Sequence, residues 1–156
     1  MVRALVCLAA AASVGAVSAV ADSGGSAACK PTAGDVPGPF ERIDAPRRAK
    51  IGAGHVLSGR VIRAGDCAPV SRALVVFWQA GPNGYVYRPR GRGSVLTDRS
   101  GRFRIEGPVP ASSGLRPPHI HMAVIHPDYE ELLTRYVVRR GATSGRMRIV
   151  SPPGER

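Results

Sequence analysis

Turn-forming residues divide this chain into short segments, and their spacing limits the folds it can adopt. The 156 residues include 19 glycines and 14 prolines, spread evenly along the sequence. No segment longer than Asp128–Leu133 has a pattern that favours a helix. From residue 55 onward, apolar runs of strand length alternate with turn residues. This pattern predicts an all-β chain that folds as a single β-sandwich domain.

The apolar runs predict where the strands lie. A nearly continuous apolar run at Arg72–Gln79 is typical of a strand buried on both faces. Asp98-Arg99-Ser100-Gly101 predicts a hairpin turn. The other strands are expected at Val56–Ile62, Ser94–Thr97, Gly101–Glu106, His119–His126, Leu132–Arg139 and Arg146–Val150.

The N-terminal residues have the features of a secretory signal. Arg3 precedes an apolar run rich in alanine and valine, and Ala19-Val20-Ala21 supplies the small residues of a cleavage site. The run is short and Ala-rich, so we expect export without a stable membrane span; a core helix is the alternative. The expected organisation is a signal peptide (1–21), a flexible lead-in (22–38), the sandwich (39–150) and a tail (151–156).

Two cysteines remain after removal of a signal that contains Cys7. An even number in an oxidising compartment favours a disulfide between Cys29 and Cys67, which would tie the N-terminal arm to the sheet. Lipidation of Cys29 after Ser26-Ala27-Ala28 is the competing interpretation. The intact mass of the exported protein distinguishes the bridge from an added diacylglycerol.

The formal charge of +11 comes almost entirely from arginine, since Lys30 and Lys50 are the only lysines. The arginines are scattered and often alternate with apolar residues, without a basic helix or an aromatic-interleaved patch. This distribution indicates a solvated surface and no nucleic-acid partner; attraction of anionic aromatic ligands is the second interpretation. The sequence makes no prediction about oligomeric state.

His119-Ile120-His121 is the motif with the clearest chemical meaning. Residues two apart in a strand point to the same face, so both imidazoles lie side by side while Ile120 faces the other way. Two imidazoles on one face can supply two nitrogen ligands to a metal ion. His-x-His alone is a weak signal, but the preceding Pro117-Pro118 fixes the direction of the strand and holds Arg116 beside the pair.

The segment Arg116–His121 resembles the signature of the intradiol ring-cleavage dioxygenases, non-haem ferric enzymes that open catechols. The similarity extends from about residue 36 to about residue 140. It includes Gly38-Pro39-Phe40, Leu57–Val61, Cys67–Val70, Phe77–Ala80, Gly84-Tyr85, Thr97-Asp98, Gly101–Phe103 and Tyr129–Thr134. The fold that this resemblance implies is again a β-sandwich.

The resemblance also implies a site and a reaction. His119, His121 and Tyr85 would bind Fe(III), a hard ion that favours phenolate oxygen and lowers the pKa of the phenol. The substrates would be an aromatic diol and O₂, and the ring would open between its hydroxyl carbons to give a muconate-type diacid. Arg116, always charged, would stabilise the negative charge that develops on the substrate.

Two positions depart from the pattern of the family. Ser113 lies where the family has a second tyrosine ligand, and Arg135 lies where it often has a glutamine near the substrate. Losing an anionic ligand favours Fe(II) over Fe(III) and leaves an arrangement similar to a facial triad. Two alternatives therefore stand beside the enzyme: a degenerate relative that binds metal without cleaving rings, and a non-catalytic exported β-sandwich module.

Structural roles are expected for the other histidines and large aromatic residues. Tyr87 could share the face of Tyr85 in an extended segment and replace the missing ligand, but a surface role is the favoured interpretation. Trp78 is interpreted as part of the core. His126 has the wrong parity to join the histidine pair and precedes Pro127, so we expect it at a strand end. His55 is expected ahead of the first strand, without a partner.

Overall fold

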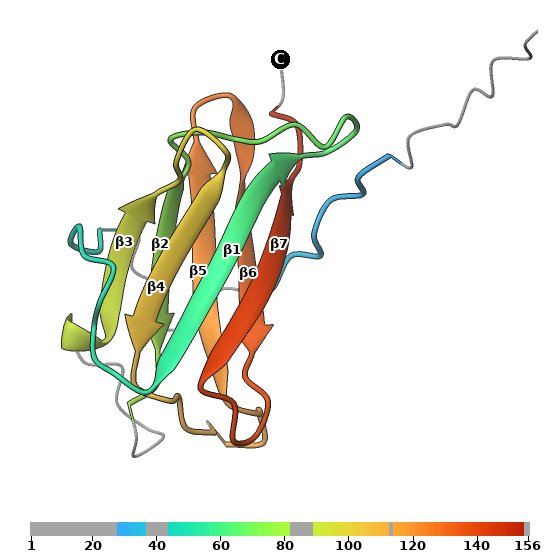
Figure 1. The fold of residues 1–156 in the computed structure, drawn as a ribbon. Coiled ribbons are helices and arrows are strands. Elements are labelled where there is room, and N and C mark those ends of the chain that lie inside the picture. The colour runs from blue at the N-terminus through green and yellow to red at the C-terminus, as the bar shows by residue number, and fades with distance from the viewer. Residues whose placement is uncertain (1–27, 37–43, 82–88, 113, 155–156) are drawn as a thin grey trace, which may run out of the picture.

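The computed structural model describes residues 28–36, 44–81, 89–112 and 114–154, and these form two stacked β-sheets (Figure 1). The elements are β1 (His55–Arg63), β2 (Leu74–Gln79), a short 3₁₀ turn η1 (Pro89–Gly91), β3 (Arg92–Leu96), β4 (Arg102–Gly107), β5 (His119–His126), β6 (Tyr129–Val137) and β7 (Ser144–Ser151). The predicted all-β sandwich is confirmed. No helix in the described ranges is long and apolar enough to cross a membrane.

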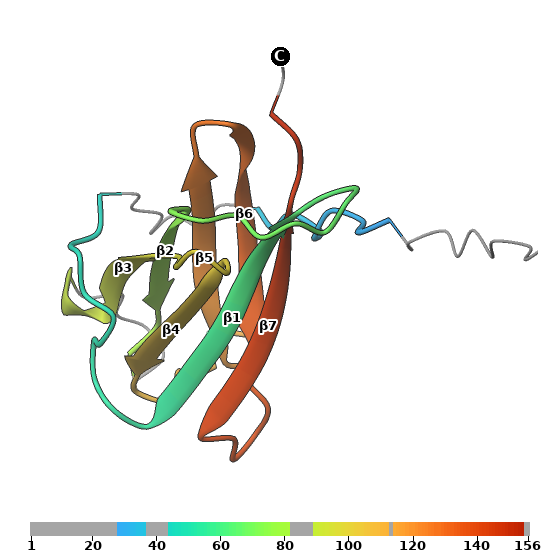
Figure 2. The same cartoon turned by 45° about the horizontal axis from the view of Figure 1, so that its top comes forward.

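One sheet has three strands in the order β4-β1-β7, and the other has four in the order β3-β2-β5-β6. Figure 2 shows the first sheet in front of the second. The first and last strands, β1 and β7, are neighbours and run parallel, whereas β1 pairs with β4 in the antiparallel direction. All pairs in the four-stranded sheet are antiparallel.

The alternation of side chains along β5 divides them between two environments. Ile120, Met122 and Val124 belong to the core between the sheets. Ala123 instead packs with Val76 and Trp78 of β2 in a smaller apolar cluster. Successive strand residues point to opposite faces, so the smaller cluster lies on the outer face of the four-stranded sheet. The prediction that β2 is buried on both faces is confirmed.

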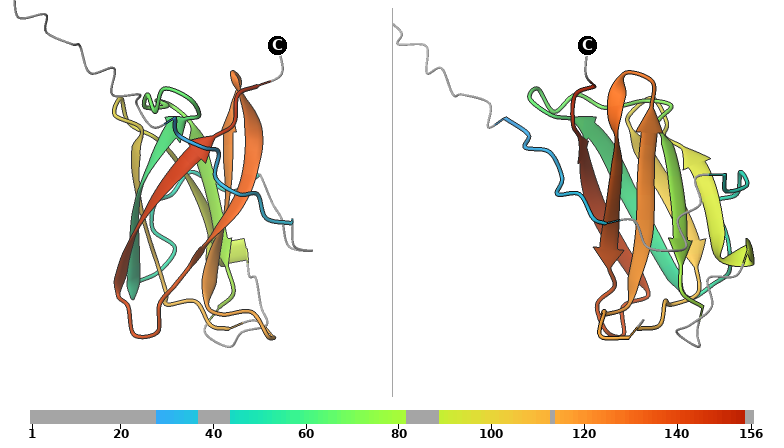
Figure 3. Two further views of the ribbon diagram at one scale, coloured as in Figure 1. Left: turned by 90° about the vertical axis from the view of Figure 1, so that its right-hand side faces the viewer. Right: turned by 180° about the vertical axis from the view of Figure 1, so that it is seen from behind.

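Residues 28–36, which we name the N-terminal arm, run along one edge of the sandwich (Figure 3). The backbone N–H of Thr32 donates to Val150 O of β7 at 3.0 Å, and that of Asp35 donates to Leu133 O of β6 at 2.8 Å. The arm therefore covers the adjacent edges of both sheets, which would otherwise expose unpaired backbone groups. This described part of the predicted flexible lead-in is attached to the sandwich.

A second segment, residues 44–51, follows the opposite edge. Its backbone N–H groups at Arg48 and Ile51 donate to Ser94 O of β3 and Glu106 O of β4, at 3.0 and 2.9 Å. Isolated parallel bridges at Arg47 and Lys50 extend this pairing. The chain thus bridges the two sheets at both of their edges before β1 begins.

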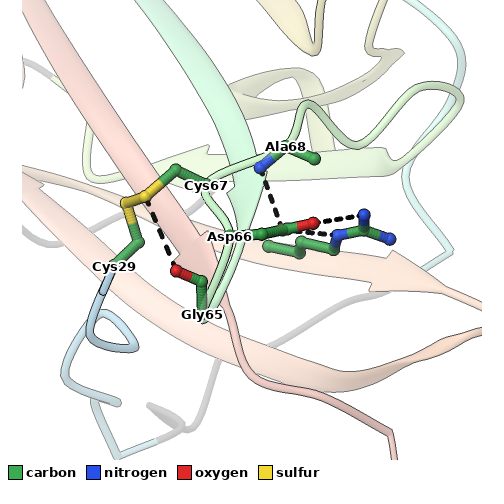
Figure 4. Close-up of a disulfide and its surroundings, with 6 residues drawn as sticks. Cys29, Gly65, Asp66, Cys67 and Ala68 are labelled. Carbon is green, nitrogen blue, oxygen red and sulfur yellow. Dashed lines mark hydrogen bonds and ion pairs between the residues drawn. A yellow bond between two sulfur atoms is a disulfide. The ribbon is translucent and has the colours of Figure 1, made fainter. Parts of the chain in front are cut away.

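The predicted disulfide between Cys29 and Cys67 is confirmed, with a Cα–Cα distance of 5.4 Å (Figure 4). It joins the start of the arm to the loop after β1. Cys29 and Gly65 also exchange two backbone hydrogen bonds, of 3.2 and 3.0 Å. Asp66 organises the loop, because its carboxylate pairs with Arg63 and accepts a hydrogen bond from Ala68 N.

His55 was predicted to lie ahead of the first strand without a partner, and this prediction was wrong. It is the first residue of β1 and is buried, and its Nδ1 lies 2.9 Å from Ala142 O in the loop before β7. Its ring also packs near Tyr136, with ring centroids 5.9 Å apart. Both contacts come from residues distant in sequence, which the local pattern does not reveal.

Candidate metal centre

His119 and His121 lie together on the outer face of the four-stranded sheet, near the start of its inner strand β5. They are buried, with 3% and 4% of their surface exposed, while Ile120 between them points into the core. The predicted orientation of the triplet is confirmed.

The two imidazole rings face each other through their Nε2 atoms. Nε2 of His119 lies 3.0 Å from Nε2 of His121, and the rings meet edge to face. Nδ1 of His119 lies 2.7 Å from the carbonyl oxygen of Pro117. A carbonyl can only accept, so this nitrogen carries the hydrogen and donates it. Nε2 of His119 therefore presents a lone pair toward His121.

This geometry fits two ligands of one metal ion. With metal–nitrogen bonds of about 2.1 Å, two ligands that subtend about 90° lie roughly 3 Å apart. The observed Nε2–Nε2 distance is 3.0 Å. In metal sites the other ring nitrogen of a histidine usually donates to a carboxylate or a backbone carbonyl, as His119 does to Pro117. The Pro117-Pro118 pair thus fixes the ring as well as the strand.

Burial favours the neutral, metal-binding form of His121. Desolvation lowers its pKa to about 4, with help from His119 and from the positive charges of Arg116 and Arg135, while Asp35 opposes the shift. Burial disfavours the charged imidazolium. At neutral pH the ring is therefore uncharged, the state that a metal ligand requires.

A row of side chains crosses the sheet at His121. Trp78 of β2 and Arg135 of β6 are its register partners on the two sides. The Trp78 ring stacks on the His121 ring, with centroids 5.3 Å apart and planes 11° apart. Trp78 is buried as predicted, but it belongs to the outer cluster rather than to the core between the sheets. It forms an apolar wall beside the histidines.

Asp35 of the N-terminal arm lies over this row. Its Oδ2 is 3.9 Å from Nδ1 of His121 and 3.6 Å from a terminal nitrogen of Arg135. The oxygen is buried and accepts no hydrogen bond from the described residues. Asp35 was not among the site residues predicted from the sequence, because it lies in the predicted lead-in and reaches the site only through pairing with β6.

Of the other predicted site residues, only Arg116 lies in the described part of the chain. Arg116 is exposed in the segment before β5, and its charge reaches the pair, since it helps to lower the pKa of His121. Tyr85, Ser113 and Tyr87 lie outside the described residues. In the ranges that are described, no third His, Cys, Asp or Glu joins the histidines in a metal-binding group.

His126 lies at the opposite end of β5, as predicted for a strand-end residue. Its Nδ1 is 3.8 Å from Oδ2 of Asp128, whose side chain is 80% exposed. This pair resembles His121 and Asp35 in composition and spacing, but its histidine is half-buried and its carboxylate is exposed. It offers a natural control for experiments on the buried pair.

Solved structures with the same fold are numerous, although no family model and no curated protein matches the sequence. The dioxygenase domain of a dioxygenase–carbohydrate-binding fusion from Streptomyces sp. SirexAA-E aligns with a TM-score of 0.71 at 24% identity, over 80% of this chain and 100% of that one. An intradiol ring-cleavage dioxygenase from Tetranychus urticae aligns with a TM-score of 0.71 at 16% identity, over 82% and 97%. The fold is that of the intradiol dioxygenases.

Larger enzymes share this intradiol dioxygenase fold. Hydroxyquinol 1,2-dioxygenase from Pseudomonas putida DLL-E4 aligns with a TM-score of 0.63 at 20% identity, over 82% of this chain and 68% of that one. Chlorocatechol 1,2-dioxygenase from Pseudomonas putida gives a TM-score of 0.64 at 16% identity, over 76% and 71%. The resemblance seen in the sequence is thus matched at the level of the fold.

Proposed function

We propose that this protein is a non-haem iron dioxygenase that opens a catechol-type ring between its two hydroxyl carbons, with O₂ as the second substrate. The observation that carries the proposal is the convergence of two buried Nε2 atoms, 3.0 Å apart, on an intradiol dioxygenase fold. The product would be a muconate-type diacid. The structural relatives support the substrate class, since two of them are named for hydroxyquinol and chlorocatechol.

His119 and His121 would hold the metal, and Tyr85 is proposed as the third ligand on the strength of the sequence resemblance. Ferric iron, when bound, makes a catecholate reactive toward O₂. The pair is suited to a cation, because His121 is neutral at physiological pH and the His119 ring is fixed by Pro117.

The surrounding residues would bind and orient the substrate. Trp78 excludes water from one side of the His121 ring and supplies an apolar wall for an aromatic diol. Arg116 and Arg135 would contribute positive charge near the histidines, and their part in lowering the pKa of His121 supports this role. Positive charge favours a catechol dianion over its neutral form and draws anionic ligands to the site.

Ser113 favours a second candidate function, that of a protein that binds a metal ion but does not cleave aromatic rings. A serine hydroxyl replaces the second tyrosine in the family pattern, and a neutral hydroxyl is a poorer ligand for Fe(III) than a phenolate. The two candidates share the histidine pair and differ in reaction. They can therefore be separated by adding substrate to the metal-loaded protein.

The test starts from protein purified with iron. A visible charge-transfer band is expected, and it should vanish in Tyr85→Phe, where the phenolate is absent. Catechol, protocatechuate and hydroxyquinol are then added in air while oxygen uptake and diacid formation are followed. Uptake in the wild-type protein and its loss in His121→Gln would support the dioxygenase. His126→Gln, at the other end of β5, is the matched control and should keep full activity.

Each remaining outcome points to another function. Stoichiometric iron without oxygen uptake on any of the three diols would favour the metal-binding relative. Failure of the wild-type protein to bind iron, zinc or copper would leave the non-catalytic sandwich module.

A further inference from the structure

We propose that Asp35 of the N-terminal arm is a positioning residue for the metal site, and that its carboxylate accepts a hydrogen bond from Nδ1 of His121 when a metal occupies Nε2. This inference rests on the proposed function, since it requires that the histidine pair binds metal. It assigns to the arm a role that the sequence resemblance does not include.

The geometry places the carboxylate on the correct side of the ring. Oδ2 of Asp35 lies 3.9 Å from Nδ1 of His121, whereas Nε2 of the same ring is the atom that faces His119. Asp35 therefore lies behind His121 and not among the metal ligands. The oxygen is buried and accepts no hydrogen bond from the described residues, and a buried carboxylate oxygen without a donor is costly.

The hydrogen bonds of His119 and His121 explain why Nδ1 of His121 does not donate to Asp35 in the metal-free protein. Nδ1 of His119 donates to Pro117, so the 3.0 Å contact between the rings needs a hydrogen on Nε2 of His121. A neutral His121 in this state carries its single hydrogen on Nε2 and has none on Nδ1. Nδ1 then cannot donate to Asp35.

Metal binding would reverse this arrangement. A metal on Nε2 of His121 displaces the hydrogen there, and the neutral ring then carries one hydrogen on Nδ1, directed at Asp35. The ring loses one proton at Nε2 and gains one at Nδ1, so its charge does not change. Closing the distance from 3.9 Å to about 2.8 Å would form a charge-assisted hydrogen bond. Such carboxylate–histidine–metal arrangements orient the ring and strengthen the ligand.

The surroundings hold Asp35 in place. Its backbone N–H donates to Leu133 O at 2.8 Å, and the Thr134 hydroxyl donates to Ala33 O at 3.3 Å. Arg135 lies 3.6 Å from Oδ2 and balances its charge. These contacts fix the arm on β6, the strand next to the histidines, so the carboxylate is supplied by the fold and not by a mobile tail.

The test compares metal affinity in wild-type protein, Asp35→Asn and the matched control Asp128→Asn, which removes the charge of the exposed carboxylate beside His126. Zn²⁺ is the probe, titrated in competition with a coloured chelator. We expect a loss of affinity of about 10–100-fold in Asp35→Asn and no change in Asp128→Asn. The backbone bond to Leu133 does not involve the side chain, and thermal unfolding of the metal-free variant checks that it folds.

Nitrogen chemical shifts of His121 provide a second measurement. They would not change if Asp35 only stabilised the fold. In wild-type protein the hydrogen should pass from Nε2 to Nδ1 on addition of Zn²⁺, and Nδ1 should show a strong hydrogen bond that is absent in Asp35→Asn. Equal Zn²⁺ affinity in wild type and Asp35→Asn, with unchanged Nδ1 shifts, would overturn the inference but leave the proposed function intact. If the wild-type protein binds no Zn²⁺ or iron at these histidines, both are overturned.

Discussion

At the scale of single residues, Thr97 shows how one hydroxyl joins separate parts of the sandwich. Its Oγ1 donates to Val70 O at 2.7 Å and accepts from Ala73 N at 2.9 Å, and the side chain is buried. Thr97→Val keeps the shape but leaves both backbone groups unpaired. Urea unfolding should show a loss of about 2–4 kcal/mol. Thr97→Ser keeps the hydroxyl, so its free energy of unfolding should fall clearly less. Equal losses of stability in the two variants would show that the hydroxyl does not hold these backbone groups together.

His121 predicts a pH dependence for the metal-free protein. Burial lowers its pKa to about 4 in the folded state from the ordinary value of 6.5, so the unfolded chain binds the proton more readily. Stability should therefore be complete above about pH 6.5 and fall as the pH drops toward 4, by no more than about 3 kcal/mol. Urea midpoints of wild type and His121→Gln between these pH values measure the difference. A parallel pH dependence in the two proteins would contradict the assignment.

At the scale of elements, the disulfide and the backbone bonds of the arm act on the same edge of the sandwich. Cys29 and Cys67 are 38 residues apart in sequence. Removing their disulfide would release the start of the arm from the loop after β1. In the double variant Cys29→Ser/Cys67→Ser, the amide of Asp35 should exchange its hydrogen on the order of 10–100-fold faster. Amides of the central strand β2 are the internal control. Equal acceleration in β2 would mean that the bond stabilises the whole sandwich and not the arm.

Strand β5 was predictable because its signals are local. The two prolines mark its start, and the alternation of residues assigns His119 and His121 to one face, so the predicted bounds match the observed strand. Asp35 and His55 were not predictable, because their partners are far away in sequence. No local pattern in a segment rich in Gly, Ala, Ser and Pro indicates that it pairs with β6, and this pairing brings Asp35 to the histidine pair.

At the scale of the whole molecule, the two sheets have outer faces of different character. The four-stranded sheet carries the histidine pair and the apolar cluster around Trp78. The three-stranded sheet carries exposed arginines on each of its strands, which the strand register gathers from distant parts of the sequence: Arg60, Arg102, Arg104, Arg146 and Arg148. The scattered arginines of the sequence thus include five on one face. In the described part of the chain, none of the five forms an ion pair with a carboxylate.

This concentration of charge predicts that salt stabilises the protein. Arg60 has Arg102 on one side and Arg148 on the other as register partners, and like charges on paired positions destabilise a sheet. Arg148→Gln should therefore raise the free energy of unfolding by about 0.2–1 kcal/mol at low salt. The gain should vanish near 1 M salt, where the screening length falls to about 3 Å. Arg140→Gln, in the loop before β7, removes the same charge away from this face and should give a smaller gain. A salt-independent gain in Arg148→Gln would point to packing of the new side chain and not to repulsion.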